Sequence, residues 1–104
     1  MLEWLENWYD SQCDGGWEHQ YGIKIETIDN PGWEITIDLE DTDIVLNPIS
    51  WTLIGDFENK WVGYKIEENK FNGASDPKNL TAIISIFKEL IENGRVNQEG
   101  IIIK

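Results

Sequence analysis

Apolar side chains recur every three or four positions through residues 2–13, which is the spacing of one face of an α-helix. Acids and amides separate the apolar positions, which are Leu2, Leu5, Trp8, Tyr9 and Cys13. Asp14-Gly15-Gly16 follows, and glycine readily adopts the left-handed backbone conformation that ends a helix. The pattern therefore predicts an N-terminal helix whose last turn holds Cys13.

The period changes to two in residues 21–39, where apolar and polar side chains alternate as they do in a half-buried β-strand. The alternation is interrupted at Pro31-Gly32, and proline followed by glycine favours a tight turn. The two halves are therefore predicted to form a β-hairpin. In this hairpin Glu34 and Asp38 point outward, away from the apolar face.

Three shorter segments, rich in aromatic and β-branched residues, follow an acidic loop at residues 40–43. This composition is typical of β-strands. Short turns separate the segments, so the economical prediction is a meander of Ile49–Ile54, Trp61–Glu67 and Lys70–Ala74.

A second amphipathic helix is predicted after Asp76-Pro77, because aspartate caps a helix and proline is favoured in its first turn. Asn93-Gly94 ends it. Its broad apolar face consists of Leu80, Ile83, Ile84, Phe87, Leu90 and Ile91. The apolar tail at residues 100–103 either adds an edge strand or docks on the core.

These elements predict an α+β fold in a single domain of residues 1–104. The N-terminal helix precedes an antiparallel sheet of four or five strands, arranged as a meander, and the C-terminal helix packs on one sheet face. The other face is then partly open. Tryptophans beyond the needs of one core layer are expected on it, namely Trp17, Trp51 and Trp61.

Charge changes the picture most, because 20 acids against 8 lysines and arginines give a net charge of -12. Residues 1–46 hold twelve of these acids and a single base, Lys24, whereas residues 47–104 are nearly balanced. Nucleic acid is excluded as a partner, since binding a polyphosphate requires many cationic groups. A lopsided negative field favours encounter with a basic protein, and the alternative interpretation is solubility alone.

The single cysteine and the single histidine are the candidates for catalysis or metal binding. A nucleophilic Cys13 needs its thiolate, which a helix C-terminus next to Asp14 disfavours. Glu18 and His19 are adjacent in an extended chain and point to opposite sides, so they do not form an acid–base pair. A structural zinc site takes four cysteine or histidine ligands, and the chain contains two. We expect no catalytic residue, no metal and no cofactor.

Targeting signals are also missing from the sequence. No basic segment precedes a long apolar run, so neither a signal peptide nor a membrane span is predicted. One cysteine forms no internal disulfide, which fits a reducing compartment. We expect a cytoplasmic protein that has no membrane partner and is a monomer or a weak homodimer.

The stretch EWLENWYDSQCDGGWEH, continued after Gln20 by YGIKIETIDNPGW, resembles the start of the immunity protein 53 family of bacterial polymorphic-toxin systems. The resemblance extends along the whole chain. Its most specific parts are Trp4, Trp8-Tyr9, Cys13-Asp14-Gly15, Trp17-Glu18-His19, Tyr21-Gly22 and Asp29-Asn30-Pro31-Gly32-Trp33. The resemblance implies a small cytoplasmic antidote that binds and neutralises a cognate toxin domain, delivered by or made in kin bacteria.

The resemblance and the charge together suggest a mode of action. Many such toxins are basic nucleases, so an acidic surface that imitates a nucleic acid is expected to cover the catalytic cleft, anchored by one or two exposed tryptophans. The hypothesised toxin-facing residues are Asp14, Trp17, Glu18, His19, Glu34, Asp38, Glu40, Asp41 and Asp43. The same turn motif also has an interpretation in folding, in which Gly15 and Gly22 serve backbone geometry and Trp17 and Tyr21 serve packing.

Two further functions stay open at this point. The first is a small cytoplasmic enzyme that uses Cys13 or His19. The second is a generic acidic adaptor that binds a basic protein other than a toxin.

Overall fold

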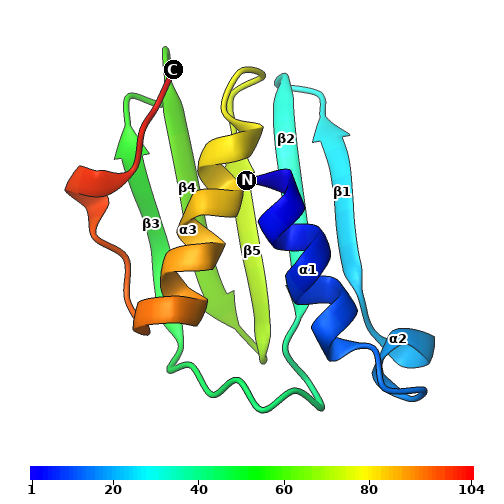
Figure 1. Cartoon of the computed structure of the whole chain (residues 1–104). Helices are drawn as coiled ribbons and strands as arrows, with labels where there is room; N and C mark the ends of the chain where they lie inside the picture. Colours follow the sequence, from blue (N-terminus) through cyan, green and yellow to red (C-terminus); the bar gives the residue numbers. More distant parts are fainter.

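One antiparallel sheet of five strands, accompanied by two long helices, forms the structure, a computed structural model that describes all residues 1–104 (Figure 1). The chain order is α1, α2, five strands, α3 and a short 3-10 turn. The helices are α1 (Leu2–Gln12), α2 (Trp17–Gln20) and α3 (Leu80–Asn93). The strands are β1 (Ile23–Ile28), β2 (Gly32–Asp38), β3 (Ile49–Gly55), β4 (Trp61–Glu67) and β5 (Lys70–Ser75). The α+β class is therefore confirmed.

The strand order is β1-β2-β5-β4-β3, which corrects the predicted meander. The last three strands do form a meander, but β2 pairs with β5 and not with β3. Residues 39–48, which we call the crossing segment, instead pass along one end of the sheet to its far edge (Figure 1). The physical reason is burial. Ile37 of β2 pairs with Phe71 of β5, and both side chains are fully buried. Strand β5 therefore lies inside the sheet, with a strand on each side.

The core lies between the sheet and α3, which contacts β5, β4 and β2. In Figure 1 both α1 and α3 lie in front of the sheet, side by side. Helix α3 comes very near the β5 backbone at Gly73, where a Cβ atom would lie 2.4 Å from Ile83 Cγ2. Glycine at this position lets α3 lie directly on β5.

Helix α1 buries a narrower face than its sequence predicts. It ends at Gln12, so Cys13 follows the helix as its capping residue. Leu5 and Trp8 are buried as expected, whereas Leu2 and Tyr9 are exposed. The reason is its position: α1 packs against α3 and, through Trp8, against Trp17 of α2, so only Leu5 and Trp8 become buried.

The predicted exposure of the tryptophans is wrong at two of three positions. Trp17 is 3% exposed and packs edge-on against Trp8, with ring centroids 6.0 Å apart. Trp61 is 5% exposed and is covered by Phe57, which stacks on it at a centroid distance of 4.7 Å. Only Trp51, at 48%, is largely exposed. An unpredicted short helix, α2, is what turns Trp17 inward.

The C-terminal tail docks on the core and adds no strand. Ile101 joins the core cluster, and the backbone N–H of Lys104 donates to Asn79 Oδ1 at 2.7 Å. None of the helices combines the length and the hydropathy that crossing a membrane requires.

Candidate functional site

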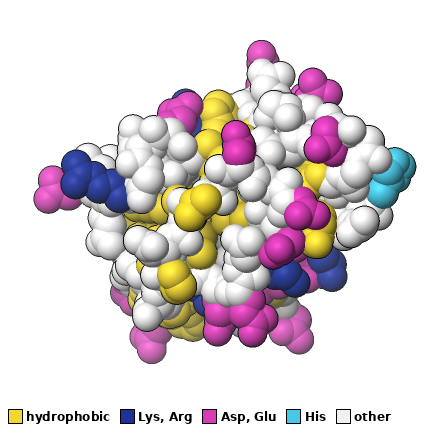
Figure 2. Space-filling view, turned by 90° about the horizontal axis from the view of Figure 1, so that it is seen from below, with side chains coloured by type: hydrophobic (Ala, Val, Ile, Leu, Met, Phe, Trp, Pro, Cys, Tyr) yellow, Lys and Arg dark blue, Asp and Glu magenta, His cyan; other side chains and the backbone are white.

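Acidic side chains gather at the end of the molecule where α1, β2 and β4 finish and where the chain crosses from β2 to β3 (Figure 1). Figure 2 views this end directly and shows carboxylates around it, with the single histidine at its rim. The backbone N–H of Leu39 donates to the Asn69 carbonyl, which joins the crossing segment to the β4–β5 turn. We call this region the acidic end and define it by Asp14, Glu18, Asp38, Glu40, Asp41, Asp43, Glu67 and Glu68.

The turn between α1 and α2 is held by two reciprocal carboxylates. Asp14 Oδ1 accepts the backbone N–H groups of Gly16 at 2.9 Å and Trp17 at 3.0 Å. The Glu18 carboxylate accepts those of Asp14 at 2.9 Å and Gly15 at 2.8 Å. Side-chain carboxylates that accept nearby backbone N–H groups stabilise tight turns, so both acids have a role in folding.

The same hydrogen bonds favour the ionised form of both acids. The backbone N–H groups of Trp17 and Gly16 lower the pKa of Asp14 below its usual value. The pKa of Glu18 is lowered by its own backbone N–H and by those of Asp14 and Gly15. The turn therefore carries two fixed negative charges.

Of the other turn residues, Trp17 is buried against α1, so its indole lies in the core and not on the surface. His19 is exposed at the rim of the acidic end (Figure 2). Cys13 Sγ donates to the backbone carbonyl of Tyr9 at 3.3 Å. No group of three or more histidine, cysteine, aspartate or glutamate side chains is arranged to hold a metal ion.

The last residue of β2 and the crossing segment after it supply the other predicted acids. Asp38 Oδ2 accepts the backbone N–H of Gly22 at 3.0 Å, which ties the start of β1 to the end of β2. Glu40 Oε2 accepts the side-chain amide of Asn69 at 3.0 Å. Asp41 and Asp43 are exposed. The positive φ of Asp41, 59°, contributes to the change of chain direction after β2.

These acids act on a neighbouring phenol, that of Tyr21. Burial raises the pKa of Tyr21, and the carboxylates of Asp41, Glu40 and Asp38 raise it further because they oppose formation of the phenolate. Tyr21 joins α2 to β1, so the carboxylates of Asp38, Glu40 and Asp41 act on the segment that follows α2.

Glu34 lies apart from the acidic end. It sits within β2 between Glu26 of β1 and Ala74 of β5, on the sheet face opposite the core. Lysines also line this face: Lys24 pairs with Glu26 at 3.5 Å and Lys65 with Glu67 at 2.6 Å. Lysines therefore offset most of the acids on the open face, whereas Glu40, Asp41 and Asp43 of the acidic end form no ion pair.

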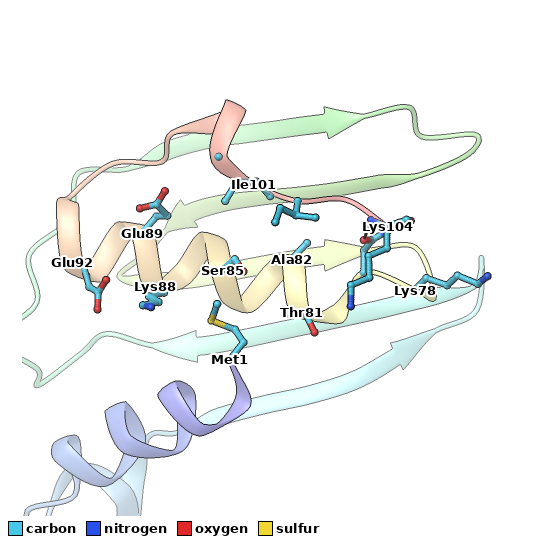
Figure 3. A pocket seen from close by; sticks show the side chains of 13 residues that line it. Met1, Lys78, Thr81, Ala82, Ser85, Lys88, Glu89, Glu92, Ile101 and Lys104 are labelled. Carbon is cyan, nitrogen blue, oxygen red and sulfur yellow. Dashed lines mark hydrogen bonds between the residues drawn. The ribbon is translucent and has the colours of Figure 1, made fainter.

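A hollow of about 390 Å³ lies elsewhere, between Met1, α3 and the C-terminal tail (Figure 3). Its charged side chains have both signs, with Lys78, Lys88 and Lys104 near Glu89 and Glu92. Because the positive and negative side chains offset one another, this hollow has no excess negative charge and is not part of the acidic end.

Comparison with known proteins assigns the chain to a family. The family model described as immunity protein 53 matches residues 2–92, which include every residue of the acidic end. The chain belongs to the immunity protein 53 family. No curated protein and no solved structure gives a match. Membership implies an immunity protein of a polymorphic-toxin system, whose partner is a toxin protein.

Glu67 and Glu68 are the residues of the acidic end of this immunity protein that sequence reasoning did not include. They lie in the half of the chain whose charges are nearly balanced, so composition gave no signal for them. Their turn reaches the crossing segment only because β5 pairs with β2. The residues Glu68-Asn69 predict a turn, but the sequence does not show that this turn lies next to the crossing segment.

Proposed function

We propose that this immunity protein neutralises its toxin by docking the acidic end on a basic surface of the toxin domain, such as the cleft of a nuclease. The observation that carries the proposal is the concentration of eight carboxylates at one end of a chain whose net charge is -12. Opposite surface potentials steer association and select against wrong partners.

The charge available to a partner comes chiefly from the crossing segment. Every ion pair in the structure uses Lys24, Lys65 or Lys70, and these lysines pair with Glu26, Glu67 and Asp38. Glu40, Asp41 and Asp43 have no cationic partner, and all three are exposed. Three such acids in four positions offer a basic protein negative charges that no lysine or arginine of the chain pairs with.

Inhibition then needs stoichiometric binding and no chemistry. Both oxygens of Glu18 accept backbone N–H groups in the α1–α2 turn, so this carboxylate is not placed to act as the base partner of His19. The thiol of Cys13 is engaged with the Tyr9 carbonyl. The toxin-facing set we propose is therefore Asp14, Glu18, His19, Asp38, Glu40, Asp41 and Asp43, with Glu67 and Glu68 added. Trp17 supports the turn from inside, and Glu34 lies outside the set.

The gene of an immunity protein is expected to lie directly downstream of its toxin gene. The direct test therefore mixes the purified chain with the toxin domain that the adjacent gene encodes. We expect a one-to-one complex and loss of toxin activity at equimolar ratio. Cys13→Ala and His19→Ala should each leave the inhibition constant within about tenfold, because neither side chain does chemistry. Abolished protection in either variant, with folding intact, would favour the enzymatic alternative, and absence of a complex would contradict the proposal.

A further inference from the structure

An exposed aromatic surface lies on the sheet face opposite the core, at the β3–β4 edge. Val62 and Tyr64 of β4 point into the core. Residues of β3 and β4 that alternate with them, such as Leu53 opposite Gly63, therefore point to the open face. We call this surface the aromatic strip and define it by the exposed side chains of Trp51, Leu53 and Phe57; the buried Trp61 supports Phe57 from below.

The indole of Trp51 packs on the sheet, and this packing fixes its position before a partner binds. A Cβ atom on Gly63 would lie 2.2 Å from Trp51 Cζ2, so the indole rests directly on the β4 backbone. Nearly half of the side chain, 48%, is still exposed. An aromatic side chain that is already ordered loses little conformational entropy on binding, which is the property of an interface anchor.

The second half of the strip is also preorganised. Phe57 stacks on Trp61 with an interplanar angle of 27°, and 53% of Phe57 is exposed. Leu53, which is exposed as well, is the strip's remaining member on β3. An apolar centre of this kind, with charged residues at its rim, has the composition of a protein interface.

A hollow next to Trp51 connects the strip to the acidic end. Its volume is about 420 Å³, and it is lined by Pro48, Ile49, Ser50, Trp51, Lys65, Ile66 and Glu67. Pro48 lies just before β3, at the close of the crossing segment, and Glu67 belongs to the acidic end. A partner that covers the acidic end therefore has an adjacent recess and an indole face for one of its side chains.

We propose that the aromatic strip, with Trp51 as its main contact, anchors the cognate toxin domain next to the acidic end. This inference rests on the proposed function above. The occupant is a basic protein, because the β3–β4 turn that holds Phe57 exposes two carboxylates, Asp56 and Glu58, against one lysine, Lys60, and because the strip adjoins the acidic end at Glu67. A second copy of the chain would bring the same carboxylates and a net charge of -12, which disfavours a homodimer. A toxin arginine or lysine suits the exposed indole through a cation–π contact.

The test measures binding of the toxin domain encoded by the adjacent gene to the full-length chain and its variants. Trp51→Ala should raise Kd about 30-fold or more, chiefly through faster dissociation. The matched control is Ile25→Ala, which truncates another partly exposed apolar side chain at the opposite sheet edge and should change Kd less than about threefold. Leu53→Gln is a second variant with a polar side chain of similar size, and it should also weaken binding.

The outcomes separate this inference from the proposed function. Wild-type binding with an unchanged Kd for Trp51→Ala and Leu53→Gln would overturn the anchor and leave the antitoxin function intact. Absence of wild-type binding would overturn both. Sedimentation of the free chain adds a third result: a homodimer that dissociates in Trp51→Ala would assign the strip to a second copy and overturn the inference.

Discussion

Phe87→Ala should lower the free energy of unfolding by about 4 kcal/mol. Phe87 is fully buried on α3, and its ring meets three other rings from α1 and β5. The centroid distances are 4.9 Å to Trp8, 5.0 Å to Phe71 and 5.9 Å to Trp4. Removing the phenyl ring leaves a cavity between a helix and a sheet that other contacts hold apart. The surroundings therefore collapse only partly, and the cavity adds to the lost transfer free energy.

Denaturant unfolding followed by circular dichroism measures this effect. The midpoint should fall while the slope m stays constant, because the surface exposed on unfolding is nearly unchanged. Phe57→Ala is the matched control, since it removes the same ring from an exposed site and should cost about 1 kcal/mol, the size of one aromatic stacking contact. Equal losses in the two variants would contradict the placement of the core.

Asp76→Ala should lower the free energy of unfolding by about 3 kcal/mol at neutral pH, since hydrogen bonds to a charged group are strong and their buried donors lose their acceptor. The Asp76 carboxylate lies at the junction of β5 and α3, where it accepts the backbone N–H groups of Trp61 and Lys78, each at 2.8 Å. It also accepts the side-chain amide of Asn79 at 2.7 Å. Asn79 in turn holds the C-terminal tail, so the loss extends to two more hydrogen bonds, both to the backbone of Lys104.

The Asp76 contribution should disappear in acid. Burial alone raises the pKa of Asp76, but its three donors, from Trp61, Lys78 and Asn79, outweigh burial and lower the pKa below the usual value. A carboxyl whose pKa is lower in the folded state stabilises the fold fully above its unfolded pKa, about 3.9. That contribution is lost as pH falls through the lower, folded pKa. The stability gap between wild type and Asp76→Ala should therefore be constant near neutral pH and close below about pH 4.

Asp29→Ala is the control for both parts of this prediction. It removes one carboxylate from the exposed β1–β2 turn, so it makes the same change in net charge without disturbing a buried network. We expect a change within about 0.5 kcal/mol. A gap between wild type and Asp76→Ala that persists unchanged into acid would contradict the assigned role of the carboxylate.

Local elements could be predicted because their patterns are local. The alternation of Ile35, Ile37 and Leu39 fixes the buried face of β2, and all three are buried in the structure. The helical spacing of Ile83, Phe87 and Leu90 fixes the face of α3 in the same way. Alternation says which face is buried but not which strand is the neighbour. The pairing of β2 with β5 depends on how the whole sheet fills the space under α3, and no single segment encodes it.

The candidate surface was predicted in part for a similar reason. The acids of the crossing segment were found from charge density alone, because Glu40, Asp41 and Asp43 lie close together in the sequence. The tryptophans were not, because Trp17 and Trp51 belong to the same residue type and differ only in what packs on them. Trp17 is enclosed by α1 and α2, whereas Trp51 is supported from one side by Gly63.

The most direct test of the account is the salt dependence of association with the toxin domain encoded by the adjacent gene. Surface charges are strongly screened as the Debye length falls from about 30 Å at 0.01 M to about 10 Å at 0.1 M salt. The association rate constant of the wild type should therefore fall about tenfold or more over this range. Neutralising three acids of the crossing segment should slow association at low salt and flatten this dependence; the variant is Glu40→Gln, Asp41→Asn and Asp43→Asn.

A control variant with the same net charge separates local from global electrostatics. It neutralises three exposed acids away from the crossing segment, by Glu3→Gln, Glu6→Gln and Asp29→Asn. This control variant should keep most of the wild-type association rate constant and of its salt dependence. The crossing-segment variant should associate more slowly at low salt and show a weaker salt dependence. Equal rates for wild type and the crossing-segment variant at low salt would contradict the claim that the acidic end receives the toxin.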